Sequence, residues 1–147
     1  MSKRARVLHL AEPPAAYRLR PALVVDCSVL SAVLFDEQTR DDALRLLAGR
    51  SLHAPTLLDH EIVSVALKKG RGGWPAPAIA LALADYMQQD IDLHRTDAET
   101  QHQLALRYRL SAYDAAYLWL ASELKAPLVT FDDKLATAAR SHLAGLP

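Results

Sequence analysis

The chain has 147 residues, of which 51% are hydrophobic and 23% are charged. This length suits a single domain, and the apolar content is too high for a disordered chain. Basic and acidic residues number 17 each, so the formal charge is zero, whereas a wholly cationic nucleic-acid binder would be more basic. A single cysteine, Cys27, excludes an internal disulfide and a multi-thiolate zinc site. We also find neither a secretory signal nor an apolar run of the roughly 18 residues that a membrane span needs, so we expect a cytoplasmic protein.

Residues 1–20 differ from the rest of the chain in charge. They hold five basic residues and one acid, a net charge of +4, and they include two adjacent prolines. We interpret this segment as a basic arm, extended or partly disordered, which either has no role or contacts a partner or RNA phosphates. The folded domain is expected to cover residues 21–147.

Short apolar runs and helical periodicity predict alternating strands and helices. In chain order we expect a strand at 23–25, helices at 29–34 and 41–48, a strand at 51–54, a helix at 57–69 opened by a capping box at 56–59, a helix at 78–89, a strand at 91–94, helices at 97–109 and 111–124, a strand at 128–130 and a helix at 134–142. Short strands that are apolar throughout indicate an α/β sandwich in which helices cover both faces of a short parallel sheet.

Acidic residues follow two of the predicted strands directly. Asp26 comes after the strand at 23–25, and Asp132 and Asp133 come just after the strand at 128–130. Each could cap the helix that begins there, and at 132–133 the spacing leaves open which carboxylate caps and which faces a site. Because ligands of such sheets bind at the carboxyl ends of the strands, these acids are candidates for a common site.

Two further acids occupy unusual helix positions. Glu61 lies on the apolar stripe of the helix at 57–69, where an ionised group is costly unless it is paired or binds a metal; the alternative is a glutamate at the stripe's edge that reaches water. Asp114 is the only charged residue within 112–122, in a helix that is apolar nearly all round. The alternative for Asp114 is a capping box with Ser111.

Carboxylates that gather at one place repel each other, and they stay ionised together only if they share a cation. The four candidates are Asp26, Glu61, Asp114 and Asp132. Because the histidines show no ligand spacing, the oxygen ligands favour Mg²⁺ or Mn²⁺ over Zn²⁺. Mg²⁺ held by carboxylates is typical of phosphate chemistry, so the set suggests a phosphodiester or phosphoryl substrate.

Four segments, taken together and in this order, carry a family resemblance. They are VVDCSVLS (24–31), APTLLDHEI (54–62), LSAYDAAYL (110–118) and LVTFDDKLA (128–136). The chain resembles the PIN-domain ribonucleases over roughly residues 22–140, and most closely the VapC toxins of bacterial type II toxin–antitoxin systems. Residues 1–20 have no counterpart in a minimal domain of this kind, and the chain's end is short where many relatives add a last strand.

The resemblance implies a PIN-like three-layer sandwich and a Mg²⁺-dependent (or Mn²⁺-dependent) endoribonuclease acting on single-stranded RNA. The implied catalytic and metal-binding residues are Asp26, Glu61, Asp114 and Asp132, since the family's Thr-x-Asp pattern selects Asp132 over its neighbour. The implied supporting residues are Ser28 and Thr130, with Asp133 a third candidate. By analogy the products carry a 5′-phosphate and a 3′-hydroxyl.

An acidic site needs basic groups to hold an RNA backbone. Candidates at the ends of two helices are Lys68, Lys69, Arg71, Arg107 and Arg109, although each could simply complement a helix dipole. The resemblance also implies a cognate antitoxin, and the apolar residues of the helices at 58–69 and 78–89 favour a homodimer. We expect no membrane association.

Three alternatives compete with a toxin ribonuclease. One is a PIN-domain nuclease that acts in RNA processing outside a toxin–antitoxin pair. Another is a non-catalytic α/β binding module whose acids merely cap helices. The third is a phosphohydrolase with an aspartyl nucleophile, which would want a second aspartate where Ser28 stands.

Overall fold

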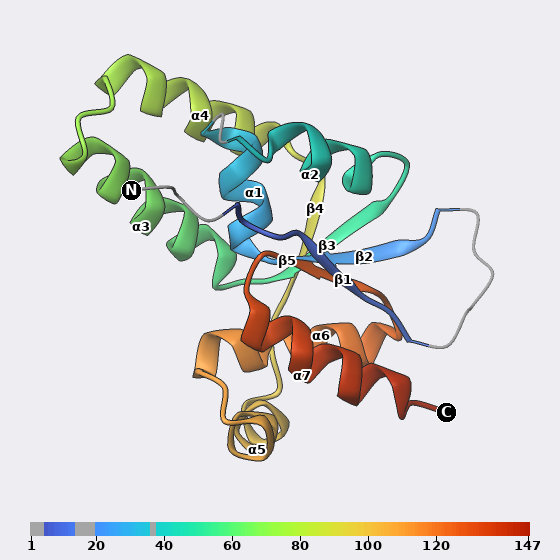
Figure 1. Cartoon of the computed structure of the whole chain (residues 1–147). Coiled ribbons are helices and arrows are strands. Elements are labelled where there is room, and N and C mark those ends of the chain that lie inside the picture. The colour runs from blue at the N-terminus through green and yellow to red at the C-terminus, as the bar shows by residue number, and fades with distance from the viewer. Residues whose placement is uncertain (1–4, 14–19, 36–37) are drawn as a thin grey trace.

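The computed structural model describes residues 5–13, 20–35 and 38–147 (Figure 1). Within these ranges the strands are β1 (His9–Ala11), β2 (Ala22–Val25), β3 (Ser51–Pro55), β4 (Ile91–His94) and β5 (Leu128–Thr130). The helices are α1 (Cys27–Leu34), α2 (Arg40–Leu47), α3 (Leu58–Arg71), α4 (Ala76–Gln88), α5 (Ala98–Tyr108), α6 (Ala112–Leu124) and α7 (Asp133–Ala144). The predicted helices and strands are all present, with ends shifted by a few residues.

The strands form one sheet in the order β1-β5-β2-β3-β4. Strand β2 pairs in parallel with β3 on one side and with β5 on the other, and β4 continues the parallel part beyond β3. Helices α1 to α4 lie on one side of the sheet and α5 to α7 on the other, which confirms the expected three-layer α/β sandwich (Figure 1). Because the strand order reverses direction beside β2, the crevice at its carboxyl end is the place where such sheets bind ligands.

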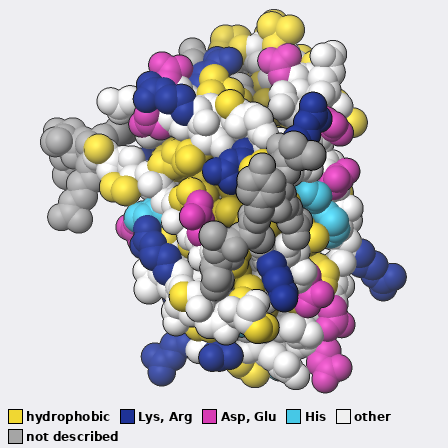
Figure 2. Space-filling view, turned by 90° about the vertical axis from the view of Figure 1, so that its right-hand side faces the viewer, with side chains coloured by type: hydrophobic (Ala, Val, Ile, Leu, Met, Phe, Trp, Pro, Cys, Tyr) yellow, Lys and Arg dark blue, Asp and Glu magenta, His cyan; other side chains and the backbone are white. Residues whose placement is uncertain are grey.

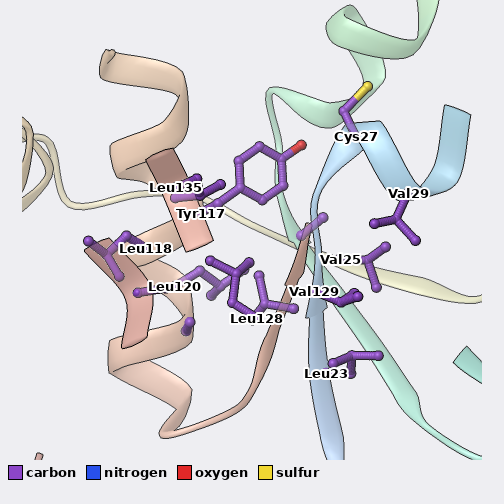
Figure 3. Packing of buried hydrophobic residues seen from close by; sticks show 14 of the residues in the cluster. Leu23, Val25, Cys27, Val29, Tyr117, Leu118, Leu120, Leu128, Val129 and Leu135 are labelled. Atoms are coloured by element: carbon purple, nitrogen blue, oxygen red, sulfur yellow. The ribbon is translucent and has the colours of Figure 1, made fainter. Parts of the chain in front are cut away.

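The core explains why the strand sequences are apolar without alternation. Leu23, Val24 and Val25 of β2 and Leu128 and Val129 of β5 are all 0% exposed. Figure 3 shows side chains of these strands between those of α6 on one side and Val29 of α1 on the other. Both faces of the sheet are covered here, so every residue of β2 and β5 is buried.

One strand lies inside the segment that we expected to be an arm. Strand β1 pairs antiparallel with β5, with His9 opposite Thr130, so the expected central parallel sheet is bordered at this edge by an antiparallel strand that was not predicted. His9 also joins β1 to α7, because Arg140 Nη2 donates to its Nδ1 at 3.0 Å and its Nε2 bonds to the Asp133 carboxylate. Strand β1 thereby covers the edge of β5.

The interpretation of residues 1–20 as a basic arm is otherwise untested. Residues 1–4 and 14–19 lie outside the described ranges. The division of the chain into a segment 1–20 and a domain 21–147 therefore stays a prediction, although β1 shows that part of the first segment packs on the second.

The capping box expected at residues 56–59 is wrong. Helix α3 begins with Leu57 at its N-cap position and has no side-chain cap hydrogen bond. Asp59 instead accepts a 2.6 Å hydrogen bond from the Tyr86 hydroxyl of α4. This bond joins the start of α3 to the end of α4. Asp59 thus serves in a contact between two helices and not in the predicted capping box.

Charge is mixed on the side of the molecule where β2 and β5 begin. Figure 2 shows Lys and Arg side chains interspersed with Asp and Glu side chains on that face, with no large region of one sign. Among the described helices, none is both long and apolar enough to cross a membrane.

Candidate metal centre and active site

Asp26 lies between β2 and α1, at the point where the strand order reverses, and only 6% of it is exposed. Its backbone N–H donates to the Val129 carbonyl at 3.0 Å, which holds the end of β2 against β5. Although Asp26 occupies the N-cap position of α1, its side chain makes no cap hydrogen bond. Its Oδ2 accepts hydrogen bonds from Ser28 Oγ at 2.7 Å and Thr130 Oγ1 at 2.8 Å. Asp26 thus occupies the N-cap position, but its carboxylate is held by two side-chain hydroxyl groups.

The two hydroxyl groups that bind Asp26 also bind the backbone after β5. Ser28 Oγ accepts from the Phe131 N–H at 3.0 Å, and Thr130 Oγ1 accepts from the Asp132 N–H at 2.9 Å. A hydroxyl has one proton to donate, and here both protons go to the Asp26 carboxylate. Burial raises the pKa of Asp26, and the charge of Asp132 adds to that, while the two hydroxyl bonds oppose the rise.

Glu61 lies in the first turn of α3, beside the buried side chains of Leu58 and Ile62 as expected. Its Oε1 accepts a 2.7 Å hydrogen bond from the Tyr117 hydroxyl of α6. Burial raises the pKa of Glu61 to about 7, with smaller contributions from the charges of Asp26 and Asp114. The Tyr117 bond acts in the opposite direction, because it stabilises the ionised carboxylate.

Asp114 lies in the first turn of α6. Its backbone N–H donates to Ser111 Oγ at 3.1 Å, so Ser111 does cap this helix. Burial, together with the charges of Asp132 and Asp26, raises the pKa of Asp114 to about 6. Ser111 thus caps the helix, while the Asp114 carboxylate faces the other acids.

The question that spacing left open at residues 132–133 has a structural answer. Asp132 Oδ1 accepts from the Leu135 N–H at 2.7 Å and caps α7, and its charge also acts on Asp26 and Asp114. The Asp133 side chain is 86% exposed and bonds to His9 of β1. Asp132 therefore caps α7 and also acts on the other acids, whereas Asp133 bonds to His9 instead.

The four carboxylates come from four separate segments and share one electrostatic environment. The charges of Asp26, Asp114 and Asp132 each raise the pKa of another member of the set. As the side chains stand, no three Asp, Glu, His or Cys residues of the described ranges form a ready group of metal ligands. The donor set nevertheless fits a hard cation such as Mg²⁺, which binds oxygen and usually takes only one or two carboxylates together with several waters.

Comparison with known proteins identifies the family. The family model described as PIN domain matches residues 23–141. The chain belongs to the PIN-domain family. The ribonuclease VapC9 of Mycobacterium tuberculosis is 33% identical over 122 residues, which cover 82% of this chain and 93% of VapC9. This PIN domain is thus a member of the VapC ribonuclease family, as the four segments indicated.

One more distant relative agrees with this assignment, and a solved structure agrees with the fold. The ribonuclease VapC3 of Pyrobaculum aerophilum is 27% identical over 120 residues, covering 78% of this chain and 92% of VapC3. The crystal structure of VapC20 of Mycobacterium tuberculosis, a toxin that cleaves the sarcin–ricin loop, superposes with a TM-score of 0.53. That match covers 71% of this chain and 85% of VapC20 at 15% sequence identity, so it bears on the fold alone.

The basic residues at the end of α3 differ in their surroundings. Lys68 lines a cleft that also contains Glu61. The Lys69 amine lies 5.4 Å from the centre of the Trp74 ring, which itself packs edge-on against Phe35 in a small core cluster. Arg71 is the last residue of the helix and is exposed. Trp74 is thus a packing residue, and Lys68 is the member of this group that shares a cleft with an acid of the site.

The basic residues near the end of α5 have other neighbours. The Arg107 guanidinium lies 5.2 Å from the Tyr108 ring centre, and its charge lowers the pKa of His142, together with burial. His142 lies ten residues after Asp132 on α7, about 15 Å along the helix axis. Arg109 is the C-cap of α5 in a left-handed conformation, with φ of 54°. Arg107 therefore lies near the C-terminal end of α7, far from the acids at its start.

Sequence reasoning missed Tyr117 as part of this site. It is 0% exposed, and Figure 3 shows its hydroxyl pointing out of the core toward the start of α1. The one available signal was its position three residues after Asp114, which puts both on the same side of α6. In an apolar helix that spacing is equally typical of core packing.

Proposed function

We propose that this PIN domain is a divalent-metal-dependent endoribonuclease that cleaves single-stranded RNA. One observation supports the proposal: Asp26, Glu61 and Asp114 come from separate segments, and burial together with the charges of neighbouring acids, Asp132 among them, raises their pKa values. Such a set is unfavourable without a compensating cation. The proposal names Mg²⁺, with Mn²⁺ as a substitute.

We assign the following roles to the residues of this site. Asp26 and Asp114 would be direct ligands, and Glu61 and Asp132 would complete the site directly or through water. When bound, a divalent cation supplies positive charge for the phosphate and lowers the pKa of a bound water. Ser28 and Thr130 orient Asp26 through its Oδ2.

The proposal extends to the cellular role of the chain. Relatives named VapC ribonucleases, and a structural neighbour described as a toxin, support a toxin of a type II toxin–antitoxin pair in the cytoplasm. A cognate antitoxin would cover the acidic site. Exposed apolar side chains on α3 and α4 favour a homodimer through these helices: Val63, Leu67 and Leu81.

A cleavage assay tests the catalytic proposal. Total RNA and a labelled unstructured oligoribonucleotide are incubated with the protein in Mg²⁺, Mn²⁺ or EDTA, and the ends of the products are mapped. We expect internal cleavage with either metal and none in EDTA. Asp26→Asn and Asp114→Asn abolish cleavage with melting temperature unchanged or raised, whereas Asp90→Asn, at an exposed acid outside the site, cleaves normally.

The alternatives predict other results. A binding module whose acids serve capping would show no cleavage by the parent protein and equal losses of stability in both aspartate variants. A PIN-domain nuclease of RNA processing would cleave RNA, but its gene would have no small neighbouring gene for a DNA-binding antitoxin, and its expression would not arrest growth.

A further inference from the structure

A cleft of about 510 Å³ opens directly beside the acidic site. This volume lies within the range of about 300 to 1,000 Å³ that is typical of small-ligand sites. Glu61 belongs both to the acidic site and to the wall of the cleft, so anything bound in the cleft is next to the carboxylates.

One face of α3 forms the long wall of the cleft. Glu61, Ser64, Val65 and Lys68 all line it, and their spacing of three, four and seven residues puts them on one side of a helix. Seven residues correspond to about 10 Å along the helix axis. The wall thus runs from a carboxylate of the acidic site to a cation.

An aromatic side chain faces this wall from α6. Tyr113 lines the cleft, is 63% exposed and directly precedes Asp114. Nucleobases stack on exposed aromatic rings of this kind with little dependence on sequence. The position of Tyr113 beside a site acid is suited to a base adjacent to the reacting phosphate.

The cation of Lys68 belongs to the lining of the cleft, together with Cys27 at the start of α1. A cation in the cleft attracts a phosphate into surroundings that the acids would otherwise make repulsive.

We propose that this cleft is a nucleotide-binding subsite, in which one unstacked base of single-stranded RNA stacks on Tyr113 while Lys68 contacts a phosphate adjacent to the one that is cleaved. The inference rests on the proposed ribonuclease function and names how its substrate is seated. A cation, an exposed ring and polar groups such as Ser64 suit a nucleotide better than an apolar peptide segment.

The first test needs no catalysis and no metal. The ¹⁵N-labelled full-length protein is titrated in EDTA with each of the four ribonucleoside 5′-monophosphates, and backbone amide shifts are followed by NMR. We expect shifts along α3 between Glu61 and Lys68 and around Tyr113, and no such shifts with inorganic phosphate alone at equal concentration. Shifts confined to other surfaces, or identical shifts with phosphate, overturn the base-binding part of the inference.

The second test uses cleavage of a short labelled oligoribonucleotide. Tyr113→Ala raises KM about ten-fold with little change in kcat, whereas Tyr113→Phe, which keeps the ring, is close to the parent. Lys68→Met also raises KM, and it reduces the dependence of KM on salt. The matched controls are Leu106→Ala, another exposed apolar side chain, and Arg45→Met, another exposed cation.

The two tests separate this inference from the proposed function. Nucleotide binding in the cleft by a protein that cleaves no RNA would contradict the ribonuclease proposal and leave the subsite standing. RNA cleavage with an unchanged KM in both Tyr113→Ala and Lys68→Met would contradict the subsite and leave the ribonuclease standing.

Discussion

The Tyr117 hydroxyl of α6 donates a 2.7 Å hydrogen bond to Glu61 Oε1 of α3, across 56 positions of sequence. The ring of Tyr117 is buried in the core, so the position of its hydroxyl is fixed by packing. A rigid donor thus holds a half-buried carboxylate at the edge of the acidic site. This contact links the core of the domain to the orientation of a candidate catalytic group.

Tyr117→Phe keeps the packed ring and removes this bond alone. We expect the pKa of Glu61 to rise further above about 7, because its burial and its acidic neighbours remain. The half-maximal Mg²⁺ concentration for cleavage should rise, since an ionised Glu61 becomes harder to form. ¹³C NMR titration of the Glu61 carboxyl in metal-free protein measures the first effect; an unchanged pKa would show that the bond does not act on this carboxylate.

Thr130→Val tests the hydroxyl that joins Asp26 to the loop after β5. The substitution is similar in shape but leaves one acceptor site of Asp26 and the Asp132 N–H without their partner. For a fully buried site we expect a loss of about 1 to 3 kcal/mol in the free energy of unfolding, and a large loss of cleavage. Urea denaturation measures the first effect, with the exposed Thr137→Val as control; equal stability of the two variants would contradict this role for Thr130.

The metal-free protein should be less stable at alkaline pH. Folding raises the pKa of Glu61 from 4.5 to about 7 and that of Asp114 from 3.8 to about 6. Between the unfolded and the folded pKa of each group, the folded chain binds more protons than the unfolded chain. The stability that these groups contribute is therefore lost as pH rises from about 4 to 7. Melting temperatures in EDTA from pH 5 to pH 8 measure the trend.

His142 requires a control in that experiment. Folding lowers its pKa below 6.5, so its contribution is lost as pH falls and opposes the acidic trend. Comparison with Glu61→Gln and Asp114→Asn isolates the carboxylates, because both variants keep His142. We expect each variant to gain stability over the parent at pH 8 and little at pH 5; a constant difference at all pH values would contradict the raised pKa values.

His9→Ala tests whether β1 is an integral part of the sheet. The His9 ring accepts from Arg140 and bonds to Asp133, and both partners belong to α7. Since its side chain is only 14% exposed, we expect a loss of about 1 kcal/mol in the free energy of unfolding. Hydrogen exchange of the β5 amides, measured in the same variant, should become faster; unchanged stability and exchange would indicate that β1 is only loosely attached.

The parts of the fold that were predictable from sequence depend on local patterns. The buried strands Ala22–Val25 and Leu128–Thr130 are apolar apart from Thr130, because helices cover both faces of the sheet. Strand β1 was missed because it has three residues, one of them fully buried, and forms only by pairing with a strand more than a hundred residues away. No local periodicity encodes such an edge strand.

The candidate site was likewise predictable only where local patterns mark its residues. Asp26 and Asp132 were found because they directly follow buried strands, and Glu61 because it interrupts an apolar stripe. The choice between Asp132 and Asp133 depended on whether a carboxylate bonds to Leu135 or to His9, which spacing does not determine. Tyr117 was missed because a tyrosine in an apolar helix gives the same pattern whether its hydroxyl serves a site or not.

The most direct test of the account is the position of a bound metal. Crystals of the protein are soaked in Mn²⁺, and an anomalous difference map is calculated for the parent and for Asp26→Asn. We predict one or more peaks among Asp26, Glu61, Asp114 and Asp132 in the parent, and a weakened or absent peak in the variant. Mn²⁺ bound elsewhere, or a parent site left empty at millimolar Mn²⁺ while the protein still cleaves RNA, would contradict a metal centre built on these carboxylates.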